Sequence, residues 1–263
     1  MQTPLRRLWR RRLVTRAFRR VARPLLGRRR FQPMFEAIHR ASLEGLNIGS
    51  AGDLASSGEL RVLRALPRGS VVLDVGANVG RYSAAAIEDR MKVHAFEPSS
   101  EAFANLTDTA GSQACLHHYG LGEREEELTL YAPEPGSGMA SVYLRRHPIA
   151  TWMPAERISL RRLDDVAAEE RIEHIDLLKL DVEGHELAVL RGASRLLAEK
   201  RIARIQFEFG GTNVDSRTYL RDFLGPLSQF SLYRIVRDGV VPVSYDEQWE
   251  IFTTTNFLAV LRR

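Results

Sequence analysis

Cysteine is nearly absent from the chain, since Cys115 is the single one among 263 residues. One thiol cannot form an intramolecular disulfide, and it supplies too few ligands for a cysteine-based zinc site. A chain without these staples fits a reducing compartment, so we expect a cytoplasmic protein. The hydrophobic content of 44% is ordinary for a packed core, which argues against disorder of the whole chain.

Long apolar runs are missing as well, and so is acidic charge near the N-terminus. Residues 1–30 contain twelve arginines and no acid, and these arginines interrupt every apolar stretch. This composition holds neither a signal-peptide core nor a membrane span. Without those twelve charges the formal net charge of +5 becomes about −7 for residues 31–263, which argues against nucleic acid as a partner. We predict a flexible basic tail, either solvated or in contact with an anionic membrane surface or an acidic polymer.

The order of apolar and polar stretches predicts the fold. Residues 31–69 read as two helices that form an N-terminal cap, and residues 70–263 as one domain. From Ser70 short apolar runs alternate with helical stretches: "SVVLDV", "RYSAAAIEDR", "KVHAFE", "SSEAFANLTDTA", "ACLHHYGL". This alternation is typical of βαβ units and a parallel sheet.

The middle of the chain interrupts this alternation. Its Pro and Gly clusters predict an insertion of strand pairs over the sheet, with a mobile loop around "PEPGSGMAS". The α/β pattern then resumes with "HIDLLKL", the helix "HELAVLRGASRLLAEK" and "IARIQFEF". Two further strands, "SLYRIVRDGVVPVS" and "NFLAVLRR", are expected to close the sheet.

A glycine-bracketed turn, "LDVGANVGRY", follows the first predicted strand and opens a helix. Gly76 and Gly80 let a ligand approach the backbone closely, and Asn78 occupies a position where a positive φ is tolerated. Glu97 ends the next strand, 21 residues after Gly76, where an acid commonly accepts hydrogen bonds from a ribose diol. The pair predicts a nucleoside site.

The details of this turn discriminate between cofactors. Nicotinamide dinucleotides favour G-x-G-x-x-G, and two of those three glycine positions are unfilled here. Asp74 is awkward beside a pyrophosphate, but it suits a cofactor with a positive centre and no phosphate, such as S-adenosylmethionine. An NAD-dependent oxidoreductase or epimerase remains the alternative, and a non-catalytic scaffold with the same fold is a third hypothesis.

Seven motifs, taken in order, resemble one family. They are "VVLDVGANVGRY", "FEPSSEAFANL", "LGEREEELTLY", "MASV", "ISLRRLDDV", "IDLLKLDVEGHELAVLRGA" and "IQFEFG". Together they are similar to the FkbM family of S-adenosylmethionine-dependent methyltransferases, from roughly Ser70 to the C-terminus. The resemblance implies a Rossmann-like class I methyltransferase fold, with seven strands, mostly parallel, and an antiparallel last strand. It also implies O-methylation of a hydroxyl on a sugar, a glycan or a secondary metabolite. The predicted cofactor-binding residues are Asp74, Gly76, Asn78, Gly80, Tyr82, Glu97 and Pro98.

The stretch "LKLDVEGHE" carries more charge than a buried strand should hold without a use. Side chains alternate along a strand, so Lys179 and Asp181 project to one side, and their pairing accounts for Lys179. Asp181 lies at the carboxyl end, where ligands of open α/β sheets bind, and Glu208 takes the same place on the following strand.

A sugar hydroxyl needs a base to accept its proton, or a metal that lowers its pKa. The candidates for catalysis are Asp181, Glu183, His185, Glu208 and Lys179. His185 is the best base by intrinsic pKa. A divalent cation held by carboxylates is an option, because hard cations favour oxygen ligands.

Structural roles compete for several of these residues. Glu183 could instead cap the helix after Gly184, and His185 could be an exposed residue of the first turn, where the family usually has a small residue. Glu186 is expected on the solvated helix face. Asp164 could cap a short helix or face the pocket. The middle segment around Gly136 to Arg146 and the N-terminal helices are expected to shape the acceptor pocket.

Overall fold

The structure, a computed structural model, describes residues 26–49, 54–148 and 150–262. Most of the arginine-rich tail therefore lies outside the described residues. Two compact units divide the chain, Met1–Leu46 and Asn47–Arg263. None of the described helices is both long enough and apolar enough to cross a membrane.

The first unit contains the helix α2 (Gln32–Gly45), which follows a short 3-10 turn at Arg29–Phe31. Pro33 sits in the first turn of α2, where its missing N–H is not needed, and Gly45 is its last residue. No residue of α2 is buried. The second predicted helix of the N-terminal cap is found as α3 (Leu54–Ser57) and α4 (Glu59–Arg64), separated by Gly58, and both belong to the second unit.

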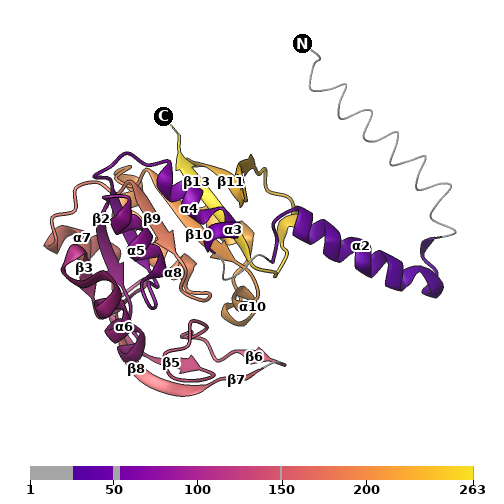
Figure 1. Cartoon of the computed structure of the whole chain (residues 1–263), viewed down its shortest axis with the longest axis horizontal. Coiled ribbons are helices and arrows are strands. Elements are labelled where there is room, and N and C mark those ends of the chain that lie inside the picture. Colours follow the sequence, from indigo (N-terminus) through magenta and orange to yellow (C-terminus); the bar gives the residue numbers. More distant parts are fainter. Residues whose placement is uncertain (1–25, 50–53, 149, 263) are drawn as a thin grey trace, which may run out of the picture. The chain divides into compact units, whose positions relative to one another are not determined.

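In the described part of the second unit, the main sheet has eight strands in the order β12-β11-β13-β10-β9-β1-β2-β3 (Figure 1). Their bounds are β1 (Val71–Val75), β2 (Lys92–Phe96), β3 (Cys115–His117), β9 (Leu177–Leu180), β10 (Arg204–Phe209), β11 (Phe230–Val236), β12 (Gly239–Pro242) and β13 (Thr255–Leu261). Strands β3, β2, β1, β9 and β10 pair in parallel, whereas β13 is antiparallel to β10 and β11.

The predicted mixed sheet with an antiparallel last strand is thus confirmed, with one addition. The stretch "SLYRIVRDGVVPVS", expected as one strand, is a hairpin of β11 and β12 that turns at Arg237 and Asp238. An Asp-Gly pair between β-branched residues is a hairpin signal, and it adds an eighth strand at the edge of the predicted seven.

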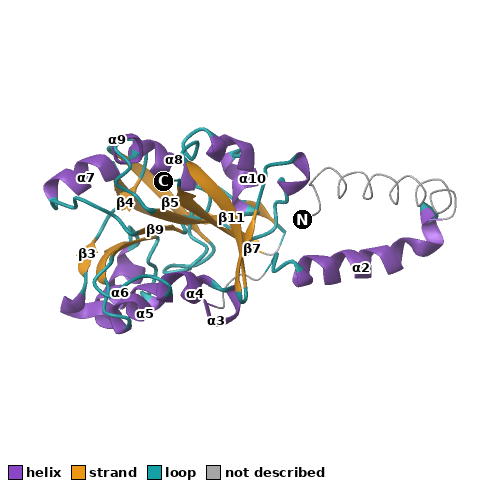
Figure 2. Cartoon of the chain, turned by 90° about the horizontal axis from the view of Figure 1, so that it is seen from above, coloured by secondary structure: helices purple, strands orange, loops and turns teal. Residues whose placement is uncertain are grey.

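Helices cover both faces of the sheet (Figure 2). One face carries α3, α4, α5 (Arg81–Glu88) and α6 (Ser100–Ala110), and the other carries α7 (Leu163–Glu169), α8 (Glu186–Gly192), α9 (Ser194–Ala198) and α10 (Thr212–Ser216). Short 3-10 turns occur at Gly111–Gln113, Leu220–Leu224 and Glu247–Trp249. Alternation along β1 feeds both layers, because Val72 packs with the α4–α6 side and Leu73 with the α7–α9 side. The helix predicted after β9 is broken into α8 and α9 at Ala193, directly after Gly192, where a Cβ atom would lie 2.0 Å from the Gly122 carbonyl oxygen.

The middle of the chain forms the insertion, as predicted. Strands β4 (Gly120–Leu121), β5 (Glu126–Ala132) and β8 (Met153–Arg161) make a separate three-stranded sheet. A small hairpin of β6 (Arg146–His147) and β7 (Ala150–Thr151) lies between β5 and β8 in the sequence. Figure 1 shows β5, β6, β7 and β8 beyond one end of the main sheet.

Candidate cofactor and acceptor site

One cavity of about 790 Å³ collects most of the predicted site residues. Its wall includes the turn after β1, the end of β2, the carboxyl ends of β9 and β10, and parts of the insertion. In an open parallel sheet, ligands bind at the carboxyl ends of the strands where the strand order reverses. That point is β1 here, because β2 and β3 follow on one side of it and β9 and β10 on the other.

The turn after β1 has the left-handed backbone that its sequence predicted. Gly76, Asn78 and Gly80 have φ values of 79°, 49° and 83°. A Cβ atom on Gly76 would lie 1.9 Å from the Asp181 carbonyl oxygen, so only glycine fits where the turn passes the end of β9. Gly76 and Asn78 line the cavity, whereas Gly80 does not. The Asn78 Oδ1 atom is buried with no hydrogen-bond partner among the described residues.

Glu97 is the second part of the predicted cofactor site. Its two carboxylate oxygens accept hydrogen bonds from the backbone N–H groups of Asn78 and Ser99, both at 2.8 Å. Burial raises the pKa of Glu97 to about 7, although these two bonds favour the charged form. Pro98 and Tyr82 also line the cavity. A carboxylate held in this way keeps lone pairs free for the hydroxyls of a ribose.

Asp74, like Gly80, is a predicted cofactor residue that does not line the cavity. Its side chain is fully buried and accepts hydrogen bonds from Ser83 Oγ at 2.7 Å and from Lys179 Nζ at 3.0 Å. It is not among the residues of the cavity wall. Strand alternation turns Asp74 toward the α5 side of the sheet, so any effect on a ligand passes through Lys179.

Lys179 connects the buried acid to the cavity. Its Nζ atom lies 3.4 Å from Asp181 Oδ2 and 5.1 Å from the centre of the Tyr82 ring. Burial disfavours its charge, but the neighbouring carboxylates, with Asp74 first, outweigh this and raise the pKa of Lys179. The predicted pair with Asp181 is therefore present, and the Lys179 ammonium group also pairs with Asp74.

Sequence reasoning missed Glu59, which joins this network from α4. Its Oε1 atom accepts a hydrogen bond from Gln206 Nε2 at 2.8 Å, and Gln206 pairs across the sheet with Lys179. Glu59 is buried and lines the cavity, and burial raises its pKa. A single acid at a helix start, 147 residues from its partner, carries no signal in the sequence.

The turn after β9 resolves the competing roles of Glu183 and Glu186. Glu183 has a φ of 52° and lines the cavity, and helix α8 begins only at Glu186, so Glu183 does not cap it. Burial, followed by Asp181, raises the pKa of Glu183 to about 8. The prediction for Glu186 was wrong: it is 1% exposed, because its Oε1 atom accepts from the backbone N–H groups of Val182 and Gly184.

His185 is buried, so its interpretation as an exposed first-turn residue was also wrong. Its Nδ1 atom lies 3.0 Å from the Tyr143 hydroxyl, and its Nε2 atom has no hydrogen-bond partner within the described part of the chain. Burial lowers the pKa of His185 to about 4. The imidazole is therefore neutral near neutral pH and is a weak base, which removes the reason for preferring it.

Glu208 meets the turn after β9 in the cavity, as its strand-end position predicted. Burial and the nearby Asp181 and Glu183 raise its pKa, and Thr254 Oγ1 donates to it at 3.4 Å. Asp164 stays outside the cavity: its carboxylate accepts from backbone N–H groups at the start of α9 and so has a capping role. Within the described ranges no three His, Cys, Asp or Glu side chains are grouped to hold a metal ion.

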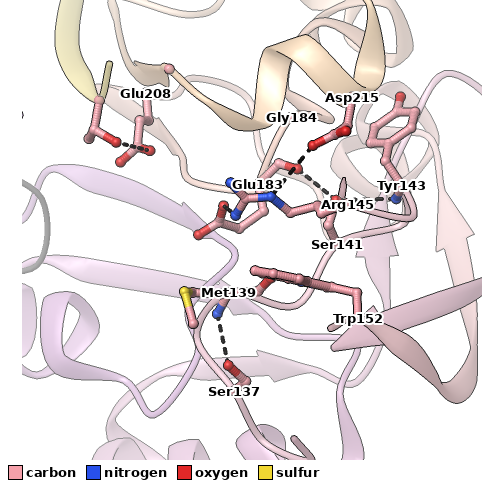
Figure 3. A network of polar contacts seen from close by, with 12 residues as sticks. Ser137, Met139, Ser141, Tyr143, Arg145, Trp152, Glu183, Gly184, Glu208 and Asp215 are labelled. Carbon is pink, nitrogen blue, oxygen red and sulfur yellow. Dashed lines mark hydrogen bonds and ion pairs between the residues drawn. The ribbon is translucent and has the colours of Figure 1, made fainter. Parts of the chain in front are cut away.

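The insertion supplies the remaining wall, as predicted for the segment around Gly136 to Arg146, although its individual contacts were not predicted. Arg145 lies between Glu183 and Asp215, at 3.5 Å and 3.7 Å, and its guanidinium stacks 4.9 Å from the centre of the Trp152 ring (Figure 3). Ser141 donates to the Glu183 carbonyl oxygen at 2.7 Å. Arg145, Trp152 and Ser141 all line the cavity. The cavity thus has a cofactor side, made by the turn after β1, and an opposite side made by the insertion.

A family model described as the methyltransferase FkbM domain matches residues 74–233 of this chain. The chain belongs to this family. The match confirms the predicted family and its class, the methyltransferases, and it covers both the turn after β1 and the turn after β9. The interpretation as a nicotinamide-dependent enzyme is therefore not supported.

Three curated proteins give the range of similarity. Methyltransferase 1 of Beauveria bassiana is 32% identical over 48% of this chain and 59% of its own length. The hexuronic acid methyltransferase AglP of Haloferax volcanii is 28% identical over 58% of this chain and 64% of its own. The 2-O-methyltransferase NoeI of Sinorhizobium fredii is 27% identical over 65% of this chain and 76% of its own. The chain thus spans less than two thirds of the length of the first two.

Proposed function

We propose that this chain transfers the methyl group of S-adenosylmethionine to a hydroxyl of a sugar, a glycan or a related secondary metabolite. One observation carries the proposal: a single cavity joins the cofactor turn and Glu97 to the carboxylates at the ends of β9 and β10. The names of two relatives, a hexuronic acid methyltransferase and a 2-O-methyltransferase, support this class of acceptor.

The residues present fit the cofactor. Gly76, Ala77 and Asn78 line the cavity, and the buried Asn78 Oδ1 atom has no hydrogen-bond partner among the described residues, so it can accept from a donor of the ligand. Glu97 is placed to accept the two ribose hydroxyls. Asp181, which lines the cavity, suits the positive part of the cofactor or the acceptor hydroxyl.

The bound cofactor supplies an electrophilic methyl group, so the protein has two tasks, alignment of the acceptor and removal of its proton. The carboxylates of Asp181 and Glu183 both line the cavity and are the proton acceptors that the geometry favours. The neutral, buried His185 is a weak base, and Glu208 is a further carboxylate of the same cavity that can bind an acceptor hydroxyl.

Calorimetric titration with S-adenosylmethionine and, separately, with NAD tests the cofactor. We expect micromolar binding of the first only, and tight binding of NAD alone would contradict the proposal. Transfer of labelled methyl to a panel of methyl hexosides, methyl hexuronides and cellular polysaccharide fractions then identifies the acceptor. Inclusion of EDTA, followed by Mg²⁺, tests the optional divalent cation, whose requirement would show as loss and recovery of transfer.

We also propose that the arginine-rich segment at residues 1–30 contacts an anionic surface. Its support is the charge count of twelve arginines without an acid, which attracts anionic lipid or an acidic polymer. Deletion of residues 1–30 should abolish co-sedimentation with phosphatidylglycerol vesicles and leave methyl transfer intact. Surface attachment by an intact chain that transfers no methyl group would favour the scaffold hypothesis.

A further inference from the structure

The segment Ser141–Arg145 of the insertion lies along the turn that follows β9 (Figure 3). Its alternate side chains contact that turn. Ser141 Oγ donates to the Glu183 carbonyl oxygen at 2.7 Å, and the Tyr143 hydroxyl is 3.0 Å from His185 Nδ1. Arg145 Nη1 is 3.5 Å from Glu183 Oε2. The segment bends at Val142 and Tyr143, where the Tyr143 N–H donates to Ser141 Oγ at 3.2 Å, and we name it the strap.

The strap is itself anchored to the insertion. The backbone N–H and C=O groups of Ser141 pair with those of Tyr131, at 2.8 and 2.9 Å. Trp152 Nε1 donates to the Met139 carbonyl oxygen at 3.1 Å, and its ring contacts the guanidinium of Arg145 and, edge-on, the His147 ring. Leu144 is 51% exposed and does not line the cavity. The strap therefore contacts the turn through Ser141, Tyr143 and Arg145, while Leu144 is exposed.

The backbone of the turn after β9 is strained, so contacts from neighbouring segments are needed to hold it. Glu183 has a φ of 52°, a left-handed conformation that costs a residue other than glycine about 1–2 kcal/mol. Gly184 follows with a φ of 100°. Strain of this kind persists where surrounding contacts hold it, and Ser141 and Arg145 hold the two ends of Glu183, its carbonyl oxygen and its carboxylate.

The charged groups around Glu183 come from three directions. Asp181 and Glu186, on the same turn, disfavour its charge, and Arg145 of the strap favours it. Glu208 of β10 lines the same cavity, and the charge of Glu183 helps to raise the pKa of Glu208. Burial and these neighbours together raise the pKa of Glu183 to about 8, and a base works best when its pKa lies near the operating pH.

We propose that Ser141, Tyr143 and Arg145 are positioning residues for Glu183, and that Glu183 takes the proton of the acceptor hydroxyl. The inference rests on the function proposed above. As the acceptor oxygen bonds to the methyl carbon, the carbon–sulfur bond breaks and its electron pair stays on sulfur, which gives S-adenosylhomocysteine. The hydroxyl proton goes to the Glu183 carboxylate, so atoms and charge balance. Ser141 and Arg145 act on Glu183 directly, and Tyr143 acts through His185.

Turnover of single variants tests the catalytic half of the proposal. Glu183→Gln should lower kcat by roughly a hundredfold or more, and Ser141→Ala by roughly tenfold, because small misplacements of a reacting group are costly. S-adenosylmethionine affinity and the acceptor KM should change much less. Leu144→Ala is the matched control, since it changes the same strap at an exposed position and should retain wild-type kcat.

The pH profile separates positioning from mere stability. Arg145 lowers the pKa of Glu183, so Arg145→Met should move the acid limb of the kcat profile to higher pH. Leu144→Ala should leave that limb in place. An active wild-type enzyme whose Glu183→Gln and Ser141→Ala variants keep full kcat would overturn the proposal.

A measurement without any acceptor keeps the two proposals distinguishable. In protein labelled with ¹³C at the glutamate carboxyl, the signal missing from Glu183→Gln reports Glu183. Its titration midpoint should rise in Arg145→Met and stay unchanged in Leu144→Ala, and amides 182–186 should exchange faster with solvent in Ser141→Ala. An unchanged midpoint and unchanged exchange refute the strap whatever the acceptor is, whereas failure of the wild type to methylate any member of the panel refutes the proposed function.

Discussion

The buried ion pair between Lys179 and Asp74 allows a quantitative prediction. The Lys179 side chain is 5% exposed and that of Asp74 is 0% exposed, and their charged atoms are 3.0 Å apart. In Lys179→Met the Asp74 carboxylate keeps only the hydrogen bond from Ser83. Removing one partner of a buried pair leaves an uncompensated charge, which costs about 3–5 kcal/mol of unfolding free energy. For a domain of this size that corresponds to a fall in melting temperature of roughly 6–20 °C.

Differential scanning calorimetry and urea unfolding measure this loss directly. The control is Arg64→Met, which removes an ion pair with Asp89 whose side chains are 58% and 32% exposed. Exposed pairs contribute up to about 1 kcal/mol, so the control should stay close to the wild type. The double variant Lys179→Met/Asp74→Leu should regain part of the lost stability, because it leaves no buried charge without a partner.

The reasoning is refuted if Lys179→Met unfolds within about 1 kcal/mol of the wild type, as the exposed control should. It is also refuted if the double variant is less stable than the sum of its single changes. Either result would mean that Asp74 is neutral in the folded protein or reaches water.

Three further predictions concern the turns and the cofactor. Gly76→Ala should cost more than about 2 kcal/mol in urea unfolding, since its Cβ atom meets the Asp181 carbonyl oxygen at 1.9 Å and φ is positive, whereas Gly225→Ala, with open space around it, should be nearly neutral. Burial raises the pKa of Glu186 from 4.5 to about 7, so its contribution to stability is complete below about pH 4.5 and is lost as the pH rises through about 7. The unfolding free energy, measured at several pH values, should therefore decline less steeply with pH in Glu186→Gln than in the wild type. An unchanged slope would contradict this. Glu97→Gln should weaken S-adenosylmethionine binding by roughly tenfold or more in calorimetry, because hydrogen bonds to a charged group are worth about 1.5–3 kcal/mol. The control is Glu88→Gln, at an exposed position of α5. Equal affinities of the two variants would exclude Glu97 from the cofactor site.

Patterns that depend on neighbouring residues predicted the structure well. The alternation of short apolar runs with helical stretches predicted the parallel sheet, and the glycine spacing predicted the left-handed turn at Gly76, Asn78 and Gly80. Strand alternation predicted that Asp181 and Glu208 would share one cavity. Backbone geometry and the period of two along a strand are local properties, so one sequence is enough to infer them.

Predictions about where a particular polar side chain goes were less reliable. Asp74 precedes the cofactor turn and was predicted to bind the cofactor, yet its side chain faces the α5 side of the sheet and pairs with Lys179. Glu186 reads as a solvated helix residue, yet its side chain folds back onto two backbone N–H groups. Both outcomes depend on which donors the packed neighbours leave unsatisfied, and a buried donor without an acceptor costs about 1–3 kcal/mol.

The sequence by itself determined the family, the α/β sheet, the cofactor turn and the strand ends at which the carboxylates lie. Only the tertiary structure decided the other half of the cavity, in which the insertion brings Arg145 against Glu183 and α4 brings Glu59 against Gln206. Such contacts join segments that are distant in the chain, and their energies come from burial and charge that exist only after the sheet has closed around them. The same burial raises the pKa of Glu183 and lowers that of His185, which reverses their order as bases.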